Sequence, residues 1–327
     1  MKKFFAILLA MLLVLSMGVS ALAEETTTDQ ETVTIKKVYQ LVGAGSSPAE
    51  TFTLEQVGNG TVKDGDATDA PALGTITGAA FAEGAATAVG AEGQITITLP
   101  EYTKVGVYEY TLKEKAGTTA GVTYYGNDIK LIVTVVNGEN GKLRIAAVHT
   151  ESTGAEKSDS FPNTYSAGTL NITKTVTGTL GDKTKLFDFS VTFTAPEEKT
   201  AKSTISYVDG TETKTLTFGE DGKATATFKL NDAASITFTN IPAGVTYTVT
   251  ESDYSAEGYT TKVGENETNK AEGTITAAEQ TAAFTNTKNG DIDTGITTDT
   301  LPYAVLLGLV VLAGAALLLK RRMGTND

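Results

Sequence analysis

Residues 33–37 read VTIKK and residues 170–174 read LNITK, and these two stretches decide the fold. In each of them apolar side chains alternate with polar ones, a period of two that is typical of a strand with one buried face. Lys37 continues the apolar row of the first strand, and Lys174 continues that of the second. Both lysines are therefore expected to point into a protein core.

The same features follow each lysine along the chain. Glu114 closes another alternating stretch, YTLKE, and Asn163 lies in FPNT; the later counterparts are Glu251 in YTVTE and Asn286 in FTNT. The lysine and the glutamate are 77 residues apart in both copies. A repeat this faithful in residue type and spacing predicts two copies of one domain.

Lysine, glutamate and asparagine buried together can form an amide cross-link. Burial lowers the pKa of a lysine and raises that of a carboxyl group, so a neutral amine can meet a protonated glutamate. We expect the glutamate to polarise the asparagine carbonyl while the amine attacks and ammonia leaves. Surface Lys–Glu pairs and Asn-Thr turns are common, but two matching sets favour the cross-link. Asn240 in FTNIP has a similar local pattern, yet a turn into YTVTE follows it.

The rest of the chain between the terminal apolar stretches predicts an all-β fold. Short alternating stretches rich in Thr, Val, Ile, Phe and Tyr recur, which favours two tandem immunoglobulin-like β-sandwich domains at 33–165 and 166–288. A polar leader, 24–32, precedes them. Residues 57–95, rich in Gly and Ala, are expected to form an extended loop, and residues 215–230 (TLTFGEDGKATATFKL) a hairpin.

Both ends of the chain carry targeting signals. Residues 1–23 have a basic start, an apolar middle and an A-x-A ending, the pattern of a secretory signal peptide. Residues 301–319 are apolar and long enough to predict a transmembrane helix, and the basic tail 320–327 is expected to stay in the cytoplasm. The linker 289–300 joins this segment to the domains, which are expected outside the membrane.

Composition excludes several function classes. The chain has no Cys, which excludes thiol chemistry. It has a single His, His149, and no Ser/His/Asp catalytic set can be supported around it. No cofactor or metal site is expected. The net charge of −13 disfavours nucleic acid and anionic lipid as partners. The chain is expected to contact the membrane only through its C-terminal helix.

Several of these stretches resemble the isopeptide-linkage domains of Gram-positive FctA-type backbone pilins: LNITKTVTG, VTYTVTESDY and AAFTNTKNGDIDTG in the second half, and VTIKKVY, GVYEYTLKE and FPNT in the first. The resemblance covers nearly all of the secreted part and implies sandwiches of the Cna B type. It implies two isopeptide bonds with a proton-handling glutamate each, namely Lys37–Asn163 with Glu114 and Lys174–Asn286 with Glu251.

The resemblance also implies that the chain is a sortase substrate. Residues Ile292, Asp293, Thr294 and Gly295 stand where the sorting motif is expected, with cleavage between Thr294 and Gly295. Asp293 replaces the usual proline of such motifs. The family's acceptor lysine lies just upstream of the first-domain asparagine, which here implies Lys157 in GAEKSDSFPN.

These expectations together describe a structural protein and not an enzyme. The first hypothesis is the backbone subunit of a sortase-polymerised pilus on a Gram-positive surface, attached to the cell wall. Its partners would be sortase, neighbouring subunits of the same chain, minor pilins and peptidoglycan. The alternative is a wall-anchored adhesin or stalk that does not polymerise. A secreted enzyme has little support, because no nucleophile–base pair or metal-ligand spacing can be placed.

Overall fold

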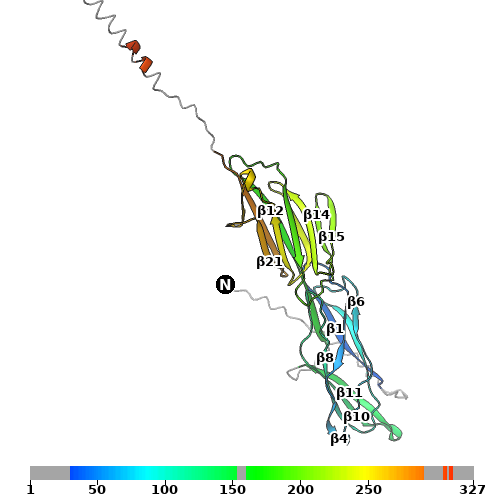
Figure 1. Ribbon diagram of the computed structural model, residues 1–327. Helices are drawn as coiled ribbons and strands as arrows, with labels where there is room; N and C mark the ends of the chain where they lie inside the picture. Colours follow the sequence, from blue (N-terminus) through cyan, green and yellow to red (C-terminus); the bar gives the residue numbers. More distant parts are fainter. Residues whose placement is uncertain (1–29, 153–159, 291–304, 308, 312–327) are drawn as a thin grey trace, which may run out of the picture.

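The computed structural model describes residues 30–152, 160–290, 305–307 and 309–311 (Figure 1). This part of the chain is mostly β-strand with little helix, which confirms the all-β prediction. Helical turns are confined to η1 (Glu139–Gly141), η2 (Ser255–Glu257) and the short stretches 305–307 and 309–311 within the described residues.

The strands of the described residues form four sheets. The sheet of 11 strands contains β1 (Thr32–Gly43), β5 (Ile76–Thr77), β7 (Ala91–Thr98), β9 (Val122–Thr123), β12 (Ser160–Thr177), β14 (Ile205–Asp209), β15 (Glu212–Leu216), β17 (Ser235–Pro242), β19 (Thr260–Val263), β20 (Asn266–Glu267) and β22 (Glu279–Thr287). The sheet of five contains β3 (Leu54–Gln56), β4 (Thr61–Gly65), β8 (Gly106–Glu114), β10 (Ile129–Asn137) and β11 (Leu143–Ser152). The sheet of four contains β13 (Phe187–Thr194), β16 (Lys223–Leu230), β18 (Thr246–Glu251) and β21 (Lys270–Thr274), and β2 (Glu50–Phe52) pairs with β6 (Ala79–Phe81).

The strands form two groups, one above the other, in an elongated arrangement (Figure 1), and each group has its own hydrophobic core. The first is built from residues between Ile35 and Ala167, and the second from residues between Leu170 and Phe284. Both form because strands with one apolar face can remove that face from water only by packing it against another sheet.

Strand β12 belongs to both cores. Its first part pairs with β1 in the first core, and its second part pairs with β17 and β22 in the second. The buried positions change from odd to even numbers at Ala167–Gly168, where the ladder with β17 is irregular. Gly168 is required there, because a Cβ at this position would lie 1.9 Å from the carbonyl oxygen of Thr276.

Side chains and backbone also join the two cores at their junction. Thr119 and Thr200 form a parallel bridge, and Ala120 N donates to Thr200 O at 3.0 Å. The Tyr165 and Ser203 hydroxyls form a buried hydrogen bond of 2.6 Å between the two cores. The junction is therefore held by hydrogen bonds between the two halves as well as by the continuous strand β12.

Two sequence predictions were wrong in detail. Residues 212–216 and 223–230 are strands, but β15 pairs with β14 and β16 pairs with β13, so they do not form the predicted hairpin. The turn at Gly219–Gly222 instead carries the chain from one sheet to another. Residues 57–95 are not one extended loop, because β4, β5, β6 and the start of β7 lie within them.

Several predictions concern residues outside the described ones. These are the signal peptide 1–23, most of the leader 24–32, Lys157, the sorting motif at Ile292–Gly295 and the tail 320–327. Of the predicted span 301–319, the described residues 305–307 and 309–311 are helical. Within the described ranges, no helix combines the length and the apolar character needed to cross a bilayer.

Candidate functional site

The strand register brings each lysine beside its predicted asparagine. Strands β1 and β12 run parallel with Tyr39 opposite Asn163, so Lys37 is two residues out of register with that asparagine. Strands β12 and β22 repeat this arrangement, with Val176 opposite Asn286 and Lys174 two residues away. Residues two positions apart share a face, and such diagonal neighbours are within reach of a long side chain.

The glutamates come from other sheets. Glu114 is the last residue of β8 in the five-stranded sheet, and Glu251 is the last residue of β18 in the four-stranded sheet. Each therefore meets the lysine and asparagine across a hydrophobic core. Among the described residues, the structure brings together all six side chains that the sequence singled out, in two sets of three.

The first site is a closed triangle of hydrogen bonds. Lys37 Nζ forms an ion pair with Glu114 Oε2 and donates to Asn163 Oδ1 at 2.7 Å. Asn163 Nδ2 donates to Glu114 Oε1 at 2.5 Å. The backbone N–H of Tyr125 also donates to Asn163 Oδ1, at 3.0 Å. The asparagine carbonyl is thus held by two donors.

The second site shares most of this arrangement. Lys174 Nζ donates to both carboxylate oxygens of Glu251, at 2.8 and 2.9 Å. Asn286 Nδ2 donates to Glu251 Oε1 at 2.5 Å. Asn286 Oδ1, however, is buried with no hydrogen-bond partner among the described residues. The two sites therefore differ at the oxygen of the asparagine carboxamide.

Both sites are buried, and their lysines lie against aromatic rings. The lysine, glutamate and asparagine of each site are all 3% exposed or less. Lys37 Nζ lies 5.2 Å from the centre of the Phe52 ring, and Lys174 Nζ lies 4.3 Å from that of Phe187. Aromatic faces stabilise a cation modestly, but they offer none of the hydrogen bonds of water. An ammonium group in either site is therefore poorly solvated.

This burial changes the protonation of the reacting groups. It lowers the pKa of Lys37, although the attraction of Glu114 acts in the opposite direction. Burial likewise lowers the pKa of Lys174 to about 8, more than the bonds to Glu251 restore. It raises the pKa of Glu251. A neutral amine is thus more accessible in both sites than at a protein surface, and so is a neutral acid at Glu251.

The glutamates lie at the amide nitrogen and not at the carbonyl oxygen, which differs from the sequence-based expectation. The Tyr125 N–H supports this orientation in the first site, because a backbone N–H can only donate: it donates to Asn163 Oδ1 at 3.0 Å and also to Glu114 Oε1 at 3.3 Å. Glu114 therefore accepts from Asn163 Nδ2. A carboxyl group in this place can exchange a proton with the lysine and with the departing nitrogen.

Asn240 lies away from both sites. It has a left-handed backbone with φ of 60°, which asparagine tolerates better than most residues. Its Oδ1 accepts from Ser46 N at 2.9 Å and its Nδ2 donates to Thr204 O at 2.9 Å, so it joins the two cores. Lys36, the neighbour of Lys37, pairs with Glu92 at the surface.

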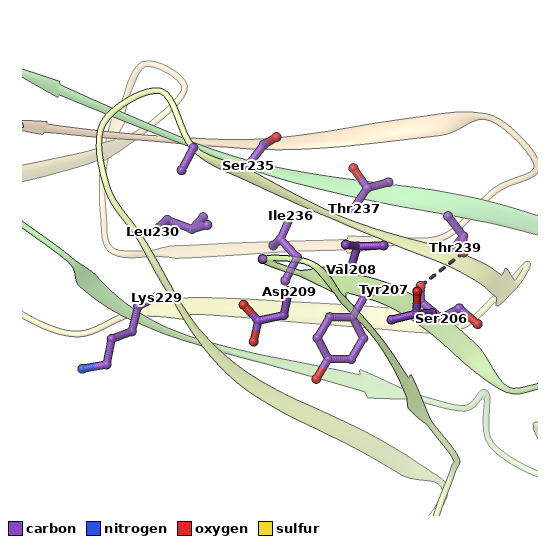
Figure 2. A pocket seen from close by; sticks show the side chains of 13 residues that line it. Ser206, Tyr207, Val208, Asp209, Lys229, Leu230, Ser235, Ile236, Thr237 and Thr239 are labelled. Atoms are coloured by element: carbon purple, nitrogen blue, oxygen red, sulfur yellow. Dashed lines mark hydrogen bonds between the residues drawn. The ribbon is translucent and has the colours of Figure 1, made fainter. Parts of the chain in front are cut away.

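A hollow beside β14, β16 and β17 carries no comparable chemistry (Figure 2). Its two charged side chains, Asp209 and Lys229, have ion-pair partners in Lys214 and Asp188. The hollow is lined by Ser206, Tyr207, Val208, Asp209, Gly210, Thr213, Lys229, Leu230, Ala234, Ser235, Ile236, Thr237 and Thr239. It is distinct from the two buried sites, whose residues do not line it.

Comparison with known families gives a match on each side of residue 167. Residues 33–166 match the FctA family, described as a Spy0128-like isopeptide containing domain. Residues 168–288 match a domain of unknown function, DUF7601. The two matches cover the strands that carry the first and the second site respectively.

Individual proteins agree with the family match. A pilin of Streptococcus pyogenes serotype M1 is 31% identical over 240 residues, covering 68% of this chain and 69% of the pilin. The pilus tip adhesin Cpa of Streptococcus pyogenes is 37% identical over 134 residues, which are 40% of this chain and 18% of the adhesin. The crystal structure of the major pilin from Streptococcus pyogenes shares the fold, with a TM-score of 0.57 and 24% identity, covering 80% of this chain and all of that chain. The chain belongs to the FctA (Spy0128-like) family of streptococcal pilins.

Proposed function

We propose that each Lys/Glu/Asn set condenses to an intramolecular isopeptide bond. The lysine ammonium gives a proton to the glutamate, and the neutral Nζ attacks Cγ of the asparagine. The C–Nδ2 bond breaks as the glutamate returns this proton to the departing nitrogen, and the glutamate then takes the surplus proton of Nζ. The ammonia carries that proton away as ammonium, so the carboxylate is restored. The observation that carries the proposal is the contact of 2.7 Å between Lys37 Nζ and Asn163 Oδ1 inside a buried triangle with Glu114.

The dry surroundings favour the product. A buried ion pair gains little net free energy, because desolvation of both charges opposes their attraction. Condensation converts the lysine cation into part of a neutral amide, and the positive charge leaves for water with the ammonium ion. The glutamate then accepts a hydrogen bond from the N–H of the new amide in place of those from an ammonium group.

The bonds would lock two tandem immunoglobulin-like sandwiches of the Cna B type, residues 33–165 and 166–288. Lys37 lies on β1, Asn163 and Lys174 lie on the shared strand β12, and Asn286 lies on the last strand β22. A covalent path would thus run from the first strand of one sandwich to the last strand of the other. Such a molecule suits a fibre that carries load.

The chain as a whole would then be the backbone subunit of a surface pilus on a Gram-positive bacterium. A signal peptide (1–23) would export it, and a helix at 301–319 with the basic tail 320–327 would hold it during sorting. Sortase would cleave after Thr294 and join this residue to Lys157 of the next subunit or, at the base, to peptidoglycan. The similarity to a pilin over two thirds of its length supports this assignment. The single-turnover bond formation makes it a structural protein and not an enzyme.

The main alternative is a wall-anchored adhesin or stalk that stays monomeric, and the partial similarity to the tip adhesin Cpa is the observation in its favour. Gel electrophoresis of cell-wall extracts in SDS distinguishes the two functions. A subunit that polymerises gives a ladder of high-mass bands, which Thr294→Ala and Lys157→Ala should abolish while the exposed control Lys142→Ala keeps it. A single wall-released band in the wild type would favour the alternative.

The protonation state of Lys174 predicts a pH dependence in a chain that cannot form the second bond. In Asn286→Ala the amine stays free, with a folded pKa of about 8 against 10.5 for an ordinary lysine. Above about pH 8 the unfolded state binds the additional proton, so the free energy of unfolding should rise by about 1.4 kcal/mol per pH unit until both states are neutral. Urea unfolding of the variant and the wild type across this range measures the difference. An equal rise in the wild type would contradict the proposal, because an amide nitrogen does not titrate there.

A further inference from the structure

The oxygen of the reacting carboxamide is where the two sites differ, and this difference bears on the rate of each reaction. Attack of an amine on Cγ of asparagine places negative charge on Oδ1. A hydrogen-bond donor already aimed at that oxygen stabilises the charge without any rearrangement. The backbone nitrogen of Tyr125 lies 3.0 Å from Asn163 Oδ1, within the range of such donors, and makes a longer contact of 3.3 Å with Glu114 Oε1.

The fold explains why this N–H takes no part in a strand ladder and can donate to the asparagine side chain. Strand β9 pairs with β12 only at Val122–Thr123, so the ladder stops beside the asparagine. The next residues would lie opposite Asn163 and Pro162, and a proline has no N–H to offer to a ladder. The chain leaves the sheet here, and Tyr125 N turns to the Asn163 side chain.

The second site has a regular strand in the corresponding place. β19 pairs with β22 along four residues, with Thr261 opposite Asn286, so its backbone groups serve the ladder. Asn286 Oδ1 is buried and has no donor among the described residues. The carboxamide oxygen that would become negative is therefore unsupported in the second site.

We infer that the backbone N–H of Tyr125 is a catalytic group that stabilises the oxyanion on Asn163 Oδ1, so that the Lys37–Asn163 bond forms faster than the Lys174–Asn286 bond. The inference rests on the proposed isopeptide chemistry. It names a catalytic donor that a substitution of the Tyr125 ring leaves in place. The ring itself packs against Phe161, with the centroids 5.2 Å apart.

A matched pair of variants isolates the N–H. Tyr125→Ala removes the ring and keeps the donor, whereas Tyr125→Pro removes both. The full-length chain is synthesised in a short cell-free pulse, synthesis is stopped, and samples are denatured in acid at intervals. Digestion and mass spectrometry then count the cross-linked peptide of each site. We expect the first bond to form about 100-fold more slowly in Tyr125→Pro than in Tyr125→Ala, with the second bond unchanged in both.

Equal rates for the first bond in the two variants would overturn the inference. If Tyr125→Pro leaves the first half sensitive to protease, the wild-type time course decides instead. There the first bond should form at least about ten-fold faster than the second, and an equal or slower rate would overturn the inference. Failure of both bonds to form in the wild type would remove the proposed chemistry itself, whereas equal rates remove only the role of Tyr125.

Discussion

A chain that carries both Asn163→Ala and Asn286→Ala is expected to lose about 4–5 kcal/mol of stability for each missing bond, the amount that the closure of a loop of more than a hundred residues gives in the chain-entropy model. For domains of this size, such a loss corresponds to a fall of roughly 10–25 °C in the melting temperature of each half. The loss arises mainly in the unfolded state, which a cross-link between the first and last strands keeps compact. Scanning calorimetry of the wild type, each single variant and the double variant measures it.

The single variants localise this effect. Asn163→Ala should lower the transition of the first core, and Asn286→Ala that of the second, because each core has its own bond. Asn171→Ala is the control, since Asn171 lies on the same strand β12 and its side chain accepts an exposed hydrogen bond from Thr237, away from both sites. Melting temperatures of both Asn→Ala variants within a few degrees of this control would contradict the stabilising role.

The response to force should change even more strongly. If subunits are joined from Thr294 to Lys157, tension enters just before β12, runs along it to Lys174, crosses to Asn286 and leaves through β22. With the second bond in place, no folded segment between these points can lengthen. In Asn286→Ala the residues between positions 174 and 286 can unravel, which adds roughly 370–400 Å at 3.3–3.6 Å per residue. Single-molecule pulling between residues 157 and 294 measures this extension.

Asn163→Ala is the control for this pulling experiment. Residues before position 157 lie outside the loaded segment, so Asn163→Ala should respond to this pulling direction as the wild type does. If the molecule is instead pulled by the two ends of the chain, the first bond also bears the tension, and Asn163→Ala should then lengthen. An extension of the wild type between residues 157 and 294 comparable to that of Asn286→Ala would show that the second bond does not carry the tension.

Much of the site could be predicted because strand alternation determines which side chains face inward. Lys37 follows Ile35 on one face, and Lys174 follows Ile172, so burial of both amines was predictable from a period of two. Strand partners were less predictable. The alternating residues 212–216 and 223–230 revealed two strands but not that they belong to different sheets, because alternation records burial and not pairing.

Groups that act through the backbone could not be predicted. Tyr125 reaches Asn163 through its N–H, which every residue except proline possesses, so residue type gives no signal there. The only hint was Pro162 in FPNT, which cannot extend a ladder. Asn240 carried the right local pattern and a different role, because its position at the junction of two cores depends on contacts with Ser46 and Thr204 far along the chain.

The most direct test of the central claim is the intact mass of the purified chain, followed by identification of its cross-linked peptides. We predict a mass lower than that of the sequence by two ammonia molecules, with Lys37 joined to Asn163 and Lys174 joined to Asn286. Glu114→Gln and Glu251→Gln should each restore the mass of one ammonia, because each removes the proton acceptor of one site. A wild-type mass equal to that of the unmodified sequence would contradict the claim.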